Sequence, residues 1–343
     1  MKFLYKSAFI CTFFHNIYKE VIPILKRFWI KKIIVATSAL FALFLICLIP
    51  DTKERTLKNI EQELEYVDYD ASKSEVFLMD VNGYLARTSM IVNGNTIEEK
   101  AKELLETLIK GSSGESKIPN GFMGILPSET KILSIEYKDD VLKVNFSKDI
   151  LYIKKELEEK LVEAIVYNLT SIDGVEKIII YVDGDILTKL PQTGINLPST
   201  LDRSFGINKE YDIKSTKNLT DVTIYYISKY NDKEYYVPVT KYVNDDREKI
   251  QIIVDELAST PIYNSNLMSY LNSNTKLLTI SQSVESLDLV FNSYIFSDAV
   301  EKEILEEVIY TIALSVRDNY DVEEVSFQIE DEEIYKSVLK TIE

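Results

Sequence analysis

The sequence predicts an α+β protein in which two tandem copies of one small domain follow an N-terminal transmembrane helix. Three observations lead to this prediction. One order of extended and helical segments occurs twice after residue 70, the two copies align at a nearly constant offset, and a long uncharged apolar run precedes them. A period near 147 residues is typical of a duplicated domain and is far longer than the repeat of a solenoid.

Composition and charge narrow the class of protein. With 343 residues and 46% hydrophobic content, the chain can bury one large core or two ordinary ones. Residues 1–50 hold seven Lys/Arg and one acid, whereas the remainder holds 32 basic and 54 acidic residues. That acidic excess disfavours nucleic-acid binding. Both cysteines, Cys11 and Cys47, lie in the first fifty residues, so the remainder can form no disulfide.

The apolar run "IIVATSALFALFLICLI" occupies residues 33–49 and carries no charge. As a helix it would be about 25 Å long, at the short end of a membrane span. The run is longer than the apolar core of a signal peptide, and Pro50-Asp51 follows it in place of a small-residue cleavage site. We therefore expect an uncleaved anchor.

The basic excess before the run predicts its orientation, with residues 1–32 as a cytoplasmic leader and residues 51–343 outside the membrane. Residues 50–70 would connect the anchor to the first repeat. A lipoprotein remains an alternative because Cys47 lies near the end of the run, although the bulky Ile46 precedes it.

Each repeat begins with a β-prone hairpin and continues into an amphipathic helix. "EVFLMD" at 75–80 corresponds to "TIYYIS" at 223–228, and the helix expected at 96–111 corresponds to the one expected at 245–260. Both helices would open with a capping box, in which side chains bind the free N–H groups of the first turn. The residue pairs are Thr96 with Glu99 and Asp245 with Glu248.

The later elements of the two repeats also align. Residues 126–147 and 271–292 are each predicted to form a hairpin, and the two segments align at an offset of 145 residues. In this alignment, Leu142, Val144 and Phe146 correspond to Leu287, Leu289 and Phe291. A second helix and a final strand follow in both copies. Each copy would be a small, mainly antiparallel sheet with two helices on one face. The boundaries are residues 71–187 for the first copy, 188–220 for a packed connector and 221–343 for the second copy.

Acidic pairs are the remaining candidates for chemistry, because residues 51–343 contain no Cys and no His. This composition excludes Ser-His, Cys-His and His-zinc sites there. Asp139-Asp140 and Asp183-Gly184-Asp185 lie where the chain must turn, and Asp245-Asp246 precedes a helix. We therefore predict no catalytic residue, no cofactor and no metal site.

Four sequence phrases resemble the GerM family of bacterial sporulation and germination proteins. They are "LIKG" at 108–111, "LPSETKILSIEYKDDVLKVNFS" at 126–147, "SIDGVEKIIIYVDGD" at 171–185 and "LDRSFGIN" at 201–208. The resemblance implies tandem GerMN domains and a non-enzymatic, membrane-anchored scaffold between mother cell and forespore. It also implies assembly with the SpoIIIA–SpoIIQ channel proteins.

A run of tyrosines is the strongest candidate for a partner contact. "YYISKYNDKEYYVPVTKY" would form a hairpin that begins the second repeat. Tyrosine favours strands, so one set would be half buried in the core, whereas tyrosines on an outer face could bind a partner or a second copy. The candidates are Tyr225, Tyr226, Tyr235 and Tyr236.

The resulting expectation is a scaffold that does not catalyse a reaction, held at the cell membrane by one span. Two alternatives remain open. One is a cell-wall hydrolase that uses acidic pairs, and the other is a receptor module that binds a small ligand between the repeats.

Overall fold

The computed structural model describes residues 73–259, 266–298, 300–329 and 332–339. The leader (1–32), the expected span (33–49) and the connector at 50–70 lie outside the described residues. Among the helices within these ranges, none is long and apolar enough to cross a membrane. The anchor therefore stays a prediction.

The first repeat starts with the hairpin β1–β2, in which seven residue pairs run from Lys73↔Ile91 to Met79↔Leu85. Two helices and a four-stranded sheet of order β4-β5-β6-β7 follow. The elements are β1 (Lys73–Asp80), β2 (Leu85–Ile91), α3 (Ile97–Leu108), β3 (Phe122–Met123), β4 (Ile132–Lys138), β5 (Val141–Phe146), α4 (Glu158–Leu169), β6 (Lys177–Val182) and β7 (Asp185–Ile186).

The second repeat has the same order, with a longer hairpin and a longer last strand. The short strand β8 (Glu210–Asp212) precedes it. Its own elements are β9 (Leu219–Tyr230), β10 (Lys233–Asn244), α5 (Lys249–Ala258), β11 (Leu277–Gln282), β12 (Ser286–Phe291), α6 (Glu306–Asn319), β13 (Glu324–Ile329) and β14 (Glu332–Val338).

The two four-stranded sheets repeat one register. In the first, β5 pairs in parallel with β6, and Phe146 lies opposite Val182. In the second, β12 pairs in parallel with β13, and Phe291 lies opposite Ile329. Both phenylalanines are buried, as the alternation of apolar residues along each strand requires. The duplication and the α+β class are thus confirmed.

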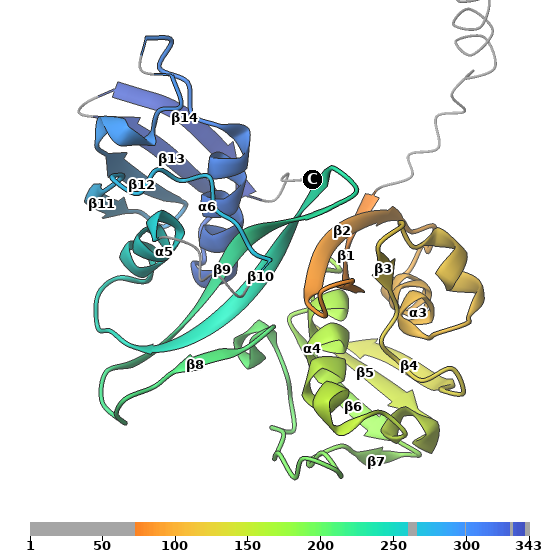
Figure 1. The fold of residues 1–343 in the computed structure, drawn as a ribbon. Coiled ribbons are helices and arrows are strands. Elements are labelled where there is room, and N and C mark those ends of the chain that lie inside the picture. The colour runs from red at the N-terminus through yellow and green to blue at the C-terminus, as the bar shows by residue number, and fades with distance from the viewer. Residues whose placement is uncertain (1–72, 260–265, 299, 330–331, 340–343) are drawn as a thin grey trace, which may run out of the picture. The chain divides into compact units, whose positions relative to one another are not determined.

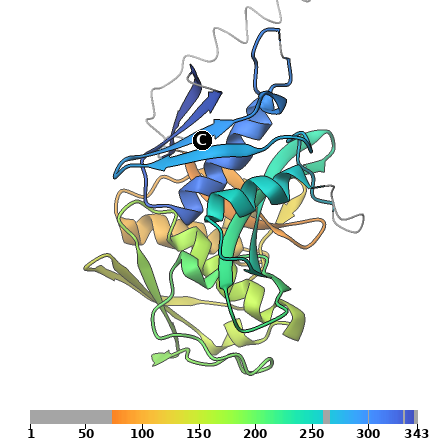
Figure 2. The same cartoon turned by 90° about the vertical axis from the view of Figure 1, so that its left-hand side faces the viewer.

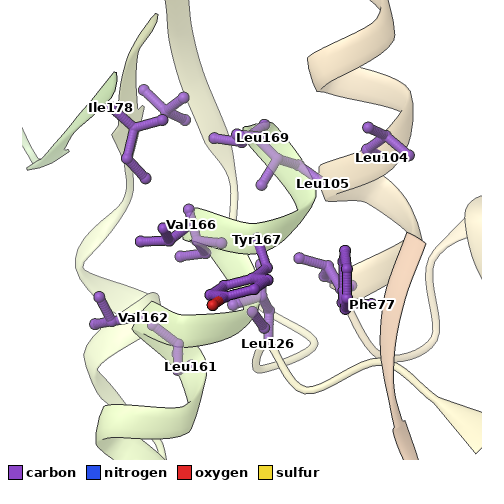
Figure 3. Packing of buried hydrophobic residues seen from close by; sticks show 14 of the residues in the cluster. Phe77, Leu104, Leu105, Leu126, Leu161, Val162, Val166, Tyr167, Leu169 and Ile178 are labelled. Atoms are coloured by element: carbon purple, nitrogen blue, oxygen red, sulfur yellow. The ribbon is translucent and has the colours of Figure 1, made fainter. Parts of the chain in front are cut away.

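The second helix of each repeat lies between two sheets, which corrects the prediction of two helices on one face of a single sheet. In α4 every residue from Leu161 to Leu169 is buried. A helix that is buried on all sides must be covered on both faces. One side faces the hairpin, where the rings of Tyr167 and Phe77 lie 5.2 Å apart, and the other faces the four-stranded sheet (Figure 3). Figures 1 and 2 show α6 in the same position in the second repeat.

The two hairpins belong to one sheet, which also corrects the expectation of a separate sheet in each copy. This sheet has six strands in the order β3-β1-β2-β10-β8, with β9 pairing on β10 (Figure 1). The hairpins meet at a single antiparallel pair, Arg87↔Tyr236. A small core formed by Ala86 of β2 together with Val237 and Val239 of β10 supports the junction.

The first helices differ at their N-termini. Thr96 and Glu99 form the predicted capping box on α3. The predicted box on α5 is wrong, because the helix begins at Lys249 and its N-cap, Glu248, makes no capping hydrogen bond. Asp245 instead binds the backbone N–H and the guanidinium group of Arg247, its neighbour two residues away.

Candidate interaction site

The tyrosine hairpin is formed by β9 and β10, which pair along twelve residues each. Asn231 and Asp232 make the turn with φ values of 47° and 63°. Helix α6 packs against β9, and so does α5. Neither face of the hairpin is an open outer face, which accounts for the apolar residues at both odd and even positions of β9.

Tyr225 and Tyr235 are buried, so they are not available for the partner contact that the sequence suggested. Tyr225 is fully buried and donates a hydrogen bond to Asp318 over 2.8 Å. Tyr235 is 8% exposed and donates one to Asp80 over 2.8 Å. Their hydroxyl groups link the hairpin to α6 and to β1, respectively, and therefore act within the chain.

Tyr226 and Tyr236 are partly exposed, and their role as a partner contact stays a prediction. The ring of Tyr226 lies 5.6 Å from the ammonium group of Lys241. Tyr236 stacks on Tyr310 of α6 with ring centroids 5.8 Å apart. Partly exposed aromatic side chains of this kind are enriched among the residues that anchor protein interfaces.

A buried cluster of charges joins the repeats beside this hairpin. Glu75 of β1 binds Arg317 of α6 over 2.7 Å, Arg203 of the connector (188–220) over 3.2 Å, and Arg87 of β2. Arg203 also binds Asp318 of α6 over 2.7 Å. The five charged side chains come from the first repeat, the connector and the second repeat, so together they fix the orientation of the two copies.

The arginines control the protonation of Glu75. Burial alone would raise the pKa of Glu75, but the charges of Arg317, Arg203 and Arg87 more than offset that effect and hold the pKa well below its ordinary value. Glu75 is therefore ionised at neutral pH, and each guanidinium group keeps a carboxylate partner. A buried cluster of this kind is strongly destabilised when one partner is removed.

Asn208 of the connector bridges the seam between the two hairpins. Its side-chain amide donates to the carbonyl oxygens of Leu85 in β2 and Pro238 in β10, both over 2.8 Å. Its backbone N–H donates to Glu163 of α4 over 2.8 Å. Burial raises the pKa of Glu163 to about 7. Asn208 thus supplies hydrogen bonds where β2 and β10 diverge.

Two of the three acidic pairs lie at turns, as predicted, and Asp245-Asp246 precedes α5. Asp139 and Asp140 have φ values of 51° and 60° between β4 and β5, and Asp183 has a φ of 48° between β6 and β7. Gly184 has a φ of 90°, a conformation that favours glycine. Over the described part of the chain, no group of three or more potential metal ligands occurs.

The charge cluster and the asparagine bridge were not predicted as sites. Arg203 and Asn208 both belong to "LDRSFGIN", a phrase that was singled out only for its resemblance. One available signal was the arginine between Leu201 and Phe205, because an arginine that is buried with such apolar neighbours needs a carboxylate partner.

Comparison with known proteins agrees with this architecture. A family profile named Germane and described as sporulation and spore germination matches residues 71–188 and 223–335. The spore germination protein GerM of Bacillus subtilis (strain 168) is 32% identical over 263 residues, which are 74% of this chain and 70% of that protein. The chain belongs to the GerM family.

A solved structure supports the same assignment. The tandem GerMN domains of the sporulation protein GerM from Bacillus subtilis superimpose with a TM-score of 0.69 at 30% identity. The match covers 76% of this chain and 91% of that one. The two repeats are therefore tandem GerMN-like domains, and the chain is related to proteins of sporulation and germination.

Proposed function

We propose that this GerM-family chain is a non-enzymatic scaffold of the envelope between mother cell and forespore. An N-terminal span would anchor it, with residues 1–32 in the cytoplasm and the GerMN-like domains outside. Its partners would be envelope proteins such as the SpoIIIA–SpoIIQ channel components. The similarity to GerM supports the sporulation context.

The observation that carries the proposal is the sheet that both repeats share, together with the Glu75 ion pairs that join the repeats beside it. Two copies joined by one loose linker would sample many orientations, whereas these copies share β-pairing, a small core and ion pairs. A scaffold needs binding surfaces at fixed separations, and tethering at a membrane raises their effective concentration for other anchored proteins.

Cross-linking and pull-down of the full-length protein from sporulating cells test this proposal. Wild type should recover channel or engulfment proteins, and Tyr226→Ser combined with Tyr236→Ser should reduce that recovery several-fold. Tyr152→Ser, at a position that is 78% exposed in the first repeat, is the matched surface control and should leave recovery unchanged. Recovery of the protein alone, or of wall fragments, would contradict the scaffold.

The hydrolase alternative is tested in the same strains. Asp183→Asn and Asp185→Asn preserve the size of side chains at the β6–β7 turn. A scaffold should retain its partners in both variants. Loss of a wall-cleaving activity in either variant would instead favour the hydrolase.

A further inference from the structure

The two sides of the tyrosine hairpin carry the same kinds of chemical group. On the side of α5, the ring of Tyr226 lies 5.6 Å from the ammonium group of Lys241, and its hydroxyl group lies 3.5 Å from the carboxylate of Glu256. Lys241 also binds Glu256 over 2.6 Å. The aromatic ring, the carboxylate and the cation all come from one chain, so this side needs no outside ligand.

On the side of α6, aromatic rings and carboxylates gather around Tyr236. Its ring stacks on that of Tyr310, with centroids 5.8 Å apart. Tyr310 also lines an open groove of about 280 Å³ between α6 and β14. Glu306 and Glu307 form the first turn of the same helix. Both tyrosines are partly exposed, so a ligand in solution has access to them.

The carboxylates lie close enough to act on the tyrosines. Burial raises the pKa of the Tyr236 hydroxyl group, and the charges of Glu307 and Glu306 raise it further. Tyr270, which lies between α5 and β11 and is 39% exposed, donates a hydrogen bond to Glu234 over 2.6 Å. That bond raises the pKa of Tyr270, and the charge of Glu307 adds to the effect. The rings from β10, α6 and this loop therefore border one acidic surface.

This surface lacks the cation that completes the side of α5. In the described part of the chain, no lysine or arginine forms an ion pair with Glu306 or Glu307, and none lies over the ring of Tyr310. Arg87 lies on the neighbouring strand, but it is bound to Glu75. Unpaired carboxylates beside stacked aromatic rings are complementary to a basic side chain, which the rings attract through cation–π contacts.

We propose that this surface binds a lysine or arginine side chain of a partner envelope protein. The charge of that side chain would pair with Glu306 and Glu307, while its stem would lie on the rings of Tyr236 and Tyr310. A basic side chain combines an apolar stem with a charged head, so one residue can contact both kinds of group. The inference rests on the proposed scaffold function and assigns the partner contact to Tyr236 rather than to Tyr226.

Site-specific photo-cross-linking locates the contact. The photoreactive amino acid p-benzoylphenylalanine takes the place of Tyr270 in the full-length protein in sporulating cells. The control places it at Tyr294, which is 53% exposed in the same repeat. Illumination should join position 270, but not position 294, to an envelope protein. Mass spectrometry of the product should find the attachment point next to a lysine or arginine.

A synthetic peptide of the attached stretch then tests the chemistry. Fluorescence anisotropy with the full-length protein in detergent should show saturable binding, which Glu306→Lys with Glu307→Lys should weaken at least about ten-fold. A peptide in which glutamate replaces the basic residues should bind this variant better than it binds wild type. The control, Glu129→Lys with Glu176→Lys, changes net charge equally at exposed positions of the first repeat and should weaken binding less than about two-fold.

The same assay compares the two sides of the hairpin. Tyr310→Ser should weaken binding about five-fold, because it removes one cation–π contact. Tyr226→Ser should leave the affinity unchanged. Circular dichroism should show that all variants are folded, and Glu306→Gln with Glu307→Gln takes the place of the lysine pair if the latter does not fold.

Five outcomes would overturn the inference. They are no cross-link at position 270, attachment to a second copy of the chain, attachment to a stretch without a basic residue, equal weakening by the two lysine pairs, and equal weakening by Tyr226→Ser and Tyr310→Ser. If one of them occurs while wild type still recovers envelope proteins, the scaffold stands and its contacts lie on another surface. If wild type recovers no envelope protein, the scaffold fails and this inference fails with it.

Discussion

The two repeats share the packing of their apolar cores and differ in what covers their second helix. Phe146 and Phe291 occupy equivalent buried positions with equivalent parallel partners. On the outer side of the helix, however, Glu163 in the first repeat is bound by the connector, whereas Tyr310 in the second borders an open groove. Core packing therefore sets the common fold of the two copies, while the polar and aromatic residues around the core differ between them.

The largest expected effect tests whether the two repeats unfold together as one cooperative unit. Phe146→Ala and Phe291→Ala each remove a buried ring and should cost about 4 kcal/mol of unfolding free energy. If the shared sheet couples the repeats, both variants should lower one common urea transition followed by circular dichroism. Two transitions, each sensitive to only one variant, would show that the repeats unfold independently.

The next effect concerns the charges that join the repeats. Glu75→Gln leaves three arginines with Asp318 as the remaining carboxylate of the cluster and should cost about 3 kcal/mol. The control is Glu324→Gln, which removes the half-exposed partner of Lys336 and should cost less than about 1 kcal/mol. Equal effects of the two substitutions in urea unfolding would refute a special role for the cluster.

Two buried carboxylates should respond to pH with opposite signs. The pKa of Glu163 is raised from 4.5 to about 7, so its contribution to stability is full below pH 4.5 and is lost as pH rises through 7. The pKa of Glu75 is lowered, so its contribution is present above pH 4.5 and is lost as pH falls further. Glu163→Gln should therefore raise stability at pH 8 by about 2 kcal/mol and flatten its decline between pH 4.5 and 7. The measurement is urea unfolding at several pH values, and an unchanged slope would contradict the assignment.

The smallest effect compares the N-termini of α3 and α5. Thr96→Ala removes the hydrogen bond from the N–H of Glu99 and should cost about 1 kcal/mol. Glu248→Ala removes no capping hydrogen bond and should change stability by less than about 0.5 kcal/mol. Similar losses in thermal unfolding would mean that the contrast between the two caps does not hold in solution.

The sequence was sufficient to predict the parts of each repeat that follow a strict apolar period. Leu142, Val144 and Phe146 alternate along β5, and Leu287, Leu289 and Phe291 alternate along β12, so a shift of one residue would turn the set away from the core. The turns at Asp139-Asp140 and Asp183-Gly184 were also predictable, because these residue types tolerate positive φ.

The junction between the repeats could not be predicted in the same way. The shared sheet depends on one strand pair, Arg87↔Tyr236, and on the side chain of Asn208, and neither gives a periodic signal. Tyr225 was a candidate for a partner contact because aromatic residues are enriched at protein interfaces, and alternation along a strand indicates only which residues share a face. Alternation does not show that another helix, here α6, covers that face.

The position of Glu75 has a mechanical consequence. The first described strand begins at Lys73, and Glu75 lies two residues further along it. Chain tension that enters from the N-terminal side meets this carboxylate near the start of β1, and the arginines of the connector and α6 carry the load into both copies. A force applied to the N-terminal end of β1 would therefore be shared between the two repeats before the β1–β2 hairpin could peel apart.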